Sequence, residues 1–230
     1  MEKIINLFRE LTRFELVLWL VSLAVVAGSF VLTPEYDILT LCASLIGVTA
    51  LIFVAKGYVA GQVLTVLFAV FYGIISYQQR YYGEMITYLC MTAPVAVLSI
   101  ITWMRNPFKG TAEVTVRSMT KRDIVIMTLL AAGVTVIFYF ILKAMGNASL
   151  MPSTISVTTS FLAVYMSMMR CPYYALGYAA NDIVLIVLWV AASLKDISCL
   201  PMVVCFAMFL VNDIYGFINW QRMQKRQAQG

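Results

Sequence analysis

Eight long apolar runs, separated by mostly short polar connections, constrain the fold of this chain more than any other feature of its sequence. Hydrophobic residues make up 62% of its 230 residues and charged residues only 12%, whereas a soluble domain is about one quarter charged. Each run has roughly 17 to 25 residues, the length that a helix needs to cross the hydrocarbon core of a bilayer. The sequence therefore predicts an all-α integral membrane protein with eight transmembrane helices, at Phe14–Leu32, Ile38–Ala55, Tyr58–Tyr77, Met85–Met104, Ile124–Ala144, Ser153–Met169, Tyr173–Leu194 and Ile197–Gln221.

The positive charges predict how these helices are oriented. If the N-terminus is cytoplasmic, 13 of the 16 Lys and Arg residues fall in cytoplasmic segments and 3 (Arg80, Lys143 and Lys195) in external ones. This asymmetry is what the positive-inside rule describes. Eight spans then place both termini on the cytoplasmic side of the membrane. The net charge of +5 thus reflects topology, and we expect membrane lipids rather than nucleic acid as its partners.

Cysteine and histidine usage argues against a metal centre. The chain has no histidine, and its five cysteines show no metal-ligand spacing, so a zinc site is not expected. We predict no cofactor. The first apolar run has a basic flank like that of a signal peptide, but it is too long for a typical signal sequence and Glu15 lies at its start. We therefore expect a retained first helix.

A weak internal repeat organises the rest of the chain. Helices two to four begin with a span that ends at Lys56 and finish at Trp103. Helices six to eight begin with a span that ends at Arg170 and finish at Trp220, at a similar distance. One span separates the two triplets, so both would start on the same side of the membrane, an arrangement typical of transporters built from parallel repeats. We expect an N-terminal segment with the first helix (1–35), a first three-helix bundle (36–105), a basic cytoplasmic loop with a linker helix (106–148), a second three-helix bundle (149–221) and a cytoplasmic tail (222–230).

Three of the six prolines, Pro152, Pro172 and Pro201, precede or open a predicted helix, which is the position that proline tolerates best. Pro94 differs from these, because it falls in the middle of the fourth run. A proline there removes a backbone hydrogen bond. The sequence therefore predicts a bend in the fourth helix.

Two Asn-Asp pairs, Asn181-Asp182 and Asn212-Asp213, lie inside the last two apolar runs. An ionised carboxylate near the middle of a bilayer costs roughly 3 kcal/mol on insertion scales, so each pair needs a compensating contact or a function. In the seventh run, Tyr174 and Tyr178 recur at helical spacing with the first pair. Tyrosine rings offer flat faces for a planar ligand, and the amide and carboxylate offer hydrogen-bonding groups. The alternative is that these side chains only hold helices together.

The first half of the chain offers further candidates for a polar site. Gln62 and Tyr72 lie on the third predicted helix, and we include both among the substrate-binding candidates, with Tyr174, Tyr178, Asn181, Asp182, Asn212 and Asp213. Glu84 is close to the predicted outer surface, where a carboxylate at a helix N-terminus is the simpler explanation. No phosphate-binding loop or histidine-based nucleophile motif is present. The flanking motifs of membrane aspartyl proteases are also missing, so we predict no enzymatic activity.

At these residues the sequence resembles the PnuC family of bacterial vitamin transporters. The resemblance covers most of the chain from about Ile46 onward. It is carried by LIGVTALIFVAKGYVAGQV around Lys56, by FYGIISYQQRYYGEM at Phe71–Met85, and by the basic and Tyr/Asp pattern at Arg170–Asp182. The family's motif of Trp, three residues, and Asn or Asp has Tyr178 at the Trp position and Asp182 at the polar position.

The resemblance implies a SWEET-like core of two three-helix bundles joined by one helix, assembled as a homotrimer. It also implies inward movement of nicotinamide riboside, or of a related vitamin or nucleoside, by facilitated diffusion, with a cytoplasmic kinase that phosphorylates and traps the substrate. Three alternatives stay open: another cargo such as thiamine, riboflavin or a deoxynucleoside; a proton-coupled symporter of the same fold; and a membrane assembly or receptor protein that transports nothing.

Overall fold

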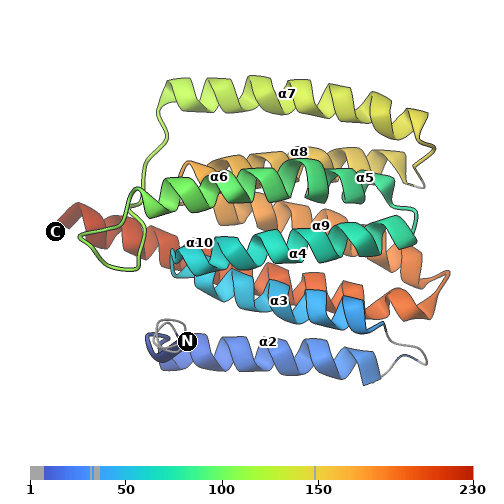
Figure 1. The fold of residues 1–230 in the computed structure, drawn as a ribbon, viewed down its shortest axis with the longest axis horizontal. Coiled ribbons are helices and arrows are strands. Elements are labelled where there is room, and N and C mark those ends of the chain that lie inside the picture. The colour runs from blue at the N-terminus through green and yellow to red at the C-terminus, as the bar shows by residue number, and fades with distance from the viewer. Residues whose placement is uncertain (1–7, 32, 34–36, 148, 230) are drawn as a thin grey trace.

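The computed structural model describes residues 8–31, 33, 37–147 and 149–229, and in this part of the chain the regular structure is helical (Figure 1). No strand occurs in these residues, which contain only the isolated β-bridges Tyr58–Glu113 and Pro107–Val114. The predicted all-α class is therefore confirmed. The helices are α2 (Arg13–Val31), α3 (Ile38–Ala55), α4 (Val59–Gln78), α5 (Tyr82–Ile86), a π-helix (Thr87–Thr92), α6 (Ala93–Met104), α7 (Lys121–Ala144), α8 (Leu150–Met168), α9 (Tyr174–Ser193), a 3₁₀ turn (Ile197–Cys199) and α10 (Leu200–Gln229).

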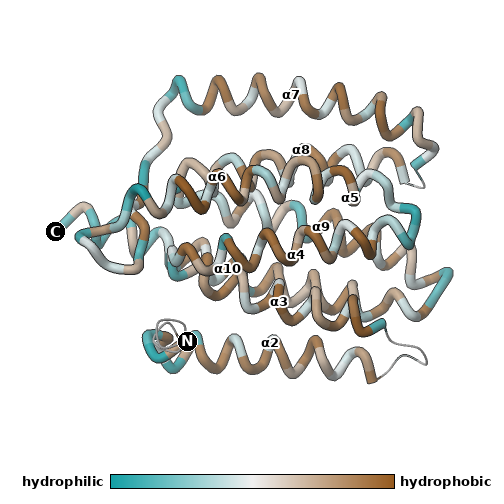
Figure 2. The backbone as a smooth tube through the Cα atoms, in the orientation of Figure 1, coloured by the Kyte–Doolittle hydropathy of each residue, from teal (hydrophilic) through white to brown (hydrophobic). Residues whose placement is uncertain are grey.

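Each of the eight predicted apolar runs forms helix, and seven of the resulting helical segments are long and apolar enough to cross a membrane. The remaining one, α8, has 19 residues but is rich in serine and threonine, which lower its hydropathy. Figure 2 shows apolar residues along most of α2 and α7, with hydrophilic residues concentrated where helices end. The chain is thus a multi-pass membrane protein.

The helices run roughly side by side in one bundle (Figure 1). Helix α2 packs on one side, against α3 and α10, and α7 lies on the opposite side, against α8 and α5. Only 6% of the residues in the most apolar part of α7 are buried, so this helix packs on the bundle along one side only, mainly against α8. We call the end of the bundle where α3 meets Lys56 the Lys56 end; α2 begins and α10 ends there.

Pro94 is accommodated by a change of helix type. The six residues Thr87–Thr92 form a π-helix, and Pro94 lies in the first turn of α6 immediately after it. Proline cannot donate a backbone hydrogen bond, and single π-turns inside α-helices often occur at functional sites. The sequence predicts a bend at Pro94, and the structure has a π-helical turn just before it.

The long polar connection between α6 and α7 is held against the end of α10. The backbone N–H of Val114 donates to the carbonyl of Gly57 at 3.0 Å, and that of Val116 donates to Oε1 of Gln227 at 2.7 Å. Arg226 forms an ion pair with Glu113 of the connection. Helix α10 thus continues well past the predicted end at Gln221, because its final turns have a partner to pack against.

Candidate functional site

A small cavity lies in the middle of the bundle, between α3, α4, the π-helix, α9 and α10. Its volume is only about 40 Å³, room for a few water molecules, whereas small-molecule sites usually have about 300–1,000 Å³. Apolar and aromatic side chains form most of the wall, and a few polar groups converge from several helices. The lining residues are Gly47, Ala50, Leu51, Val54, Gln62, Thr65, Phe68, Tyr88, Thr92, Tyr178, Asn181, Asp182, Phe209 and Asp213.

Two carboxyl groups face each other across this cavity. Asp182 of α9 is 4% exposed and Asp213 of α10 is 3% exposed, and their side chains lie within hydrogen-bonding reach of each other. Oδ2 of Asp182 has no hydrogen-bond donor among the described residues. The cavity wall contains no lysine or arginine, so nothing in the described part of the wall compensates a negative charge here.

Asn181 belongs to a second polar group beside the carboxyl pair. Its Oδ1 faces the hydroxyls of Thr159 at 2.9 Å and Ser156 at 3.1 Å, and its Nδ2 donates to the Tyr88 hydroxyl at 3.4 Å. The Ser156 hydroxyl also lies 3.0 Å from Oε2 of Glu84. A hydroxyl carries a single hydrogen, so Ser156 can donate to only one of these two oxygens at a time.

Glu84 is not among the substrate-binding candidates from sequence, and it does lie in the first turn of a helix, α5, as predicted, but it is not exposed there. Its side chain is completely buried, and its Oε1 has no partner in the described residues. The sequence signal was the position of a carboxylate just before an apolar run, which does not distinguish a solvated helix start from a buried one. Tyr88, Thr65, Phe68 and Phe209 were missed for a similar reason, because single aromatic or hydroxyl residues on an apolar helix give no signal of facing a cavity.

Aromatic rings close the cavity toward the Lys56 end. Tyr178 lines the cavity, and its ring contacts that of Tyr174 at a centroid distance of 5.9 Å. Tyr174 in turn packs against Trp220 at 4.8 Å, and Trp220 against Trp103 at 5.5 Å. Tyr174 is therefore buried in the layer beneath the cavity and does not line it.

The two tryptophans of this layer make matching hydrogen bonds between distant parts of the chain. Nε1 of Trp103 donates to the carbonyl of Ser167 at the end of α8, at 3.0 Å, and Nε1 of Trp220 donates to the carbonyl of Val54 at the end of α3, at 2.9 Å. Gln62, a predicted site residue that does line the cavity, also donates to the Ser167 hydroxyl at 2.9 Å. These bonds fix the floor of the cavity to both α3 and α8.

A second aromatic cluster closes the other side. Tyr72 is fully buried and accepts a hydrogen bond from Nε1 of Trp189 at 2.9 Å. Its ring packs against Tyr88 at 4.4 Å and Phe206 at 5.4 Å. Tyr72, a predicted site residue, thus lies behind the cavity wall rather than in it.

Asn212 points away from the cavity. Its Nδ2 donates to the Ser22 hydroxyl of α2 at 3.0 Å and to the carbonyl of Met208 at 2.8 Å. Neighbouring residues on a helix point about 100° apart, so Asp213 can face the cavity while Asn212 faces α2. Of the eight predicted site residues, the structure brings Gln62, Tyr178, Asn181, Asp182 and Asp213 to one cavity, and leaves Tyr72, Tyr174 and Asn212 outside it.

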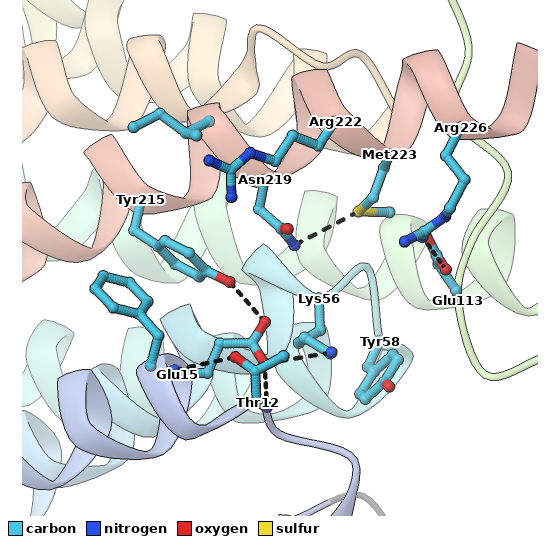
Figure 3. A pocket seen from close by; sticks show the side chains of 12 residues that line it. Thr12, Glu15, Lys56, Tyr58, Glu113, Tyr215, Asn219, Arg222, Met223 and Arg226 are labelled. Carbon is cyan, nitrogen blue, oxygen red and sulfur yellow. Dashed lines mark hydrogen bonds and ion pairs between the residues drawn. The ribbon is translucent and has the colours of Figure 1, made fainter.

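A larger pocket of about 440 Å³ lies at the Lys56 end, between α2, α3 and α10 (Figure 3). Its buried carboxylate, Glu15, is fully paired: it lies 3.3 Å from Nζ of Lys56, and it accepts from the Tyr215 hydroxyl and the Thr12 N–H, both at 2.6 Å. These contacts of Glu15 join α2 to Lys56 at the end of α3 and to Tyr215 of α10.

Comparison with known proteins shows which family this chain belongs to. A family model described as nicotinamide mononucleotide transporter matches residues 37–222. The chain is 28% identical over 229 residues to the nicotinamide riboside transporter PnuC of Neisseria mucosa, which covers 97% of this chain and 86% of that protein. It is 22% identical over 214 residues to the protein of the same name from Haemophilus influenzae, with 91% of each chain covered.

A solved structure described as the crystal structure of the vitamin B3 transporter PnuC has the same fold. The TM-score is 0.84 at 27% sequence identity, and the match covers 96% of both chains. The family resemblance seen in the sequence motifs is thereby confirmed over nearly the whole chain. This protein belongs to the PnuC family of membrane transporters and is not an enzyme.

Proposed function

We propose that this protein moves nicotinamide riboside inward across the bacterial cytoplasmic membrane by facilitated diffusion, and that a cytoplasmic kinase then phosphorylates and traps it. The single observation that carries the proposal is the uncompensated carboxyl pair, Asp182 and Asp213, in a small cavity beside Tyr178. Nicotinamide riboside has a planar pyridinium ring with a permanent positive charge. A carboxylate can balance that charge, and a tyrosine face can stack on the ring.

The charge of the cavity also favours the riboside over the mononucleotide named in the family description. A mononucleotide carries a phosphate, which proteins bind through arginine, lysine or backbone N–H groups. The described wall of the cavity has no basic side chain and two acidic ones. A phosphate placed there would meet like charge in a desolvated site, so we exclude nucleotides from the substrate class.

We further infer that α8 crosses the membrane as an eighth span and that two three-helix bundles move against each other. In this arrangement α3, α4 and α5–α6 form one bundle, α8–α10 the other, and α7 links them. The matching bonds from Trp103 to Ser167 and from Trp220 to Val54 support it, since each joins the last helix of one bundle to the first helix of the other. Opening either aromatic layer would expose the cavity to one side. Cytoplasmic termini, which the distribution of basic residues predicts, and a homotrimer, which the family resemblance implies, complete the proposal.

A thermal-shift screen of the purified protein tests the substrate. Nicotinamide riboside, its mononucleotide, thiamine, riboflavin and a deoxynucleoside are compared at equal concentration, and the riboside should raise the melting temperature most. Asp182→Ala should lose this shift, whereas Glu15→Gln, which removes a buried carboxylate elsewhere, should keep it. If another compound gave the largest shift, the cargo would be wrong. If none gave a shift, the cavity would not be a binding site for any of these compounds.

Uptake into proteoliposomes tests the mechanism. With the membrane potential clamped, internal riboside should rise to the external concentration and stop there. Enclosing a riboside kinase and ATP should raise the total accumulated label, and an uncoupler should leave the initial rate unchanged. Accumulation above the external concentration without kinase, abolished by the uncoupler, would instead identify a proton-coupled symporter.

A further inference from the structure

A pocket of about 250 Å³ lies at the end of the bundle opposite the Lys56 end, where α3 and α10 begin and α4 and α9 end. The distribution of basic residues predicts that this end faces outward, so we call it the outer pocket. It is much larger than the central cavity of about 40 Å³. Its lining residues are Phe30, Asp37, Thr40, Ile75, Gln78, Gln79, Trp189, Ser198, Cys199 and Met202.

The outer pocket lies in line with the central cavity. On each of four helices, a residue that lines the pocket and one that lines the cavity are seven positions apart. Seven positions are two helical turns, about 10.5 Å along the axis, and return to nearly the same face. The pairs are Thr40 and Gly47 on α3, Ile75 and Phe68 on α4, Trp189 and Asp182 on α9, and Met202 and Phe209 on α10. One continuous surface of four helices therefore leads from the outer pocket to the cavity.

A single layer of side chains separates the two spaces. It contains Tyr72 of α4, Leu185 of α9 and Phe206 of α10, each at most 1% exposed. The rings of Tyr72 and Phe206 are 5.4 Å apart, and Nε1 of Trp189 donates to the Tyr72 hydroxyl at 2.9 Å. Trp189 thus has two roles, because it lines the outer pocket and also holds Tyr72 in the layer beneath it.

The outer pocket has the groups that a hydroxylated aromatic cation needs. Asp37 is the one charged residue among the described lining residues, and it forms no ion pair with a described lysine or arginine. Its carboxylate caps the first turn of α3 and remains exposed. The indole of Trp189 can stack on a cationic ring, and the amides of Gln78 and Gln79 can hydrogen-bond to hydroxyls.

We propose that the outer pocket is a second, external binding site for the riboside, from which the substrate enters the central cavity when Trp189 turns away from Tyr72. The pyridinium ring lies against the Trp189 indole with Asp37 beside it, and breaking the bond to Tyr72 opens the layer. Binding there needs no ion gradient, so transport remains facilitated diffusion. The inference rests on the proposed function for the identity of the cargo.

Quenching of tryptophan fluorescence tests the external site, because a pyridinium ring in contact with an indole quenches its emission. The probe is nicotinamide riboside added to the purified full-length protein carrying Asp182→Ala, which weakens binding in the central cavity. Quenching should still saturate in this variant. Adding Trp189→Phe should abolish it, whereas adding Trp19→Phe, which removes an indole of α2, should not. Adding Asp37→Asn should weaken the quenching affinity about threefold, as expected for an exposed charge.

The outcomes separate this site from the proposed function. With Asp182 intact, Trp189→Phe should keep the riboside-dependent rise in melting temperature, which reports a folded protein and an intact central cavity. Quenching that persists in the variant with Asp182→Ala and Trp189→Phe would overturn the external site and leave the proposed function standing. Absence of riboside binding to the unmodified protein would overturn both.

A native cysteine tests the layer. Cys205 is fully buried, precedes Phe206 on α10 and belongs to the same buried cluster as Tyr72 and Trp189. It can be made the only cysteine of the chain by Cys42→Ala, Cys90→Ala, Cys171→Ala and Cys199→Ala. In right-side-out membrane vesicles of this variant, a membrane-impermeant thiol reagent should modify Cys205 slowly.

Removing the hydrogen bond of the layer should speed this modification. Tyr72→Phe keeps the ring but cannot accept from Trp189, so the rate should rise about fivefold, as expected for one hydrogen bond. Tyr81→Phe is the matched control, because the Tyr81 ring also packs against Trp189, at 5.4 Å, without accepting its N–H, and the rate should stay unchanged. An unchanged rate in Tyr72→Phe would overturn the route through this layer.

Discussion

Glu15 and the Asp182–Asp213 pair are buried to the same degree but are treated differently by their surroundings. Glu15 is 2% exposed and has an ammonium group and two further donors within hydrogen-bonding distance. The aspartates are 4% and 3% exposed, and a carboxyl is their principal polar neighbour. Burial alone thus does not separate a structural carboxylate from a functional one. Pairing with a positive charge of the protein does separate the two kinds, because a carboxylate that is already paired gains little from binding a cationic ligand.

The largest expected effect comes from truncating the cavity carboxylate. Asp182→Ala should lower riboside affinity at least about 30-fold, the lower end of the roughly 2–5 kcal/mol lost when one partner of a buried charge pair is removed. Titration with the riboside measures the change. The melting temperature of the empty protein should not fall, since the pair is unbalanced without ligand. Normal affinity in this variant would remove Asp182 from the site.

Substitution of Lys56 should lower stability and leave riboside affinity unchanged, which is the opposite of the result expected for Asp182. Lys56→Met leaves Glu15 buried without its cation, and we expect a loss of about 2 kcal/mol of stability, less than the roughly 3–5 kcal/mol for a fully buried pair because Lys56 is partly exposed. Thermal unfolding measures it, while riboside affinity should stay unchanged. Combining Lys56→Met with Glu15→Gln should restore part of the stability. Loss of binding in a stable Lys56 variant would contradict the assignment of this pocket to structure.

Tyr178 separates stacking from charge within the cavity. Tyr178→Ala should weaken riboside binding about tenfold, from the roughly 1–2 kcal/mol of a desolvated cation–aromatic contact. Tyr178→Phe should stay close to the unmodified protein, because it keeps the ring, and Tyr178→Trp should bind at least as tightly. An equal loss in the alanine and phenylalanine variants would show that the hydroxyl, not the ring, is required.

The smallest effect belongs to the exposed ion pair at the rim of the Lys56-end pocket. Arg226→Ala removes the partner of Glu113, but the arginine side chain is largely exposed. Surface pairs contribute about 0–1 kcal/mol, so stability should change within that range and transport should not change. A larger loss would mean that docking of the α6–α7 connection on α10 matters for the whole bundle.

The sequence by itself determined the helices and their predicted orientation. The length of an apolar run and the positions of basic residues are local properties, and they decide whether a segment crosses the membrane and which end stays inside. It also marked Asp182 and Asp213, since a carboxylate in such a run is energetically conspicuous on its own. The predicted end of α10 at Gln221 was too early, because its extension depends on contacts with the α6–α7 connection far away in the sequence.

Only the tertiary structure decided which polar side chains share the cavity. Helical spacing predicts that Tyr174 shares a site with Tyr178, and adjacency in sequence suggests the same of Asn212 and Asp213. In the structure Tyr174 packs in the tryptophan layer and Asn212 donates to Ser22 of α2. They also gave Glu15 its lysine and left the aspartate pair without one. Composition and periodicity show that a charged residue lies in an apolar helix and is therefore costly to bury. Whether an opposite charge lies beside it depends on how helices from distant parts of the chain pack together.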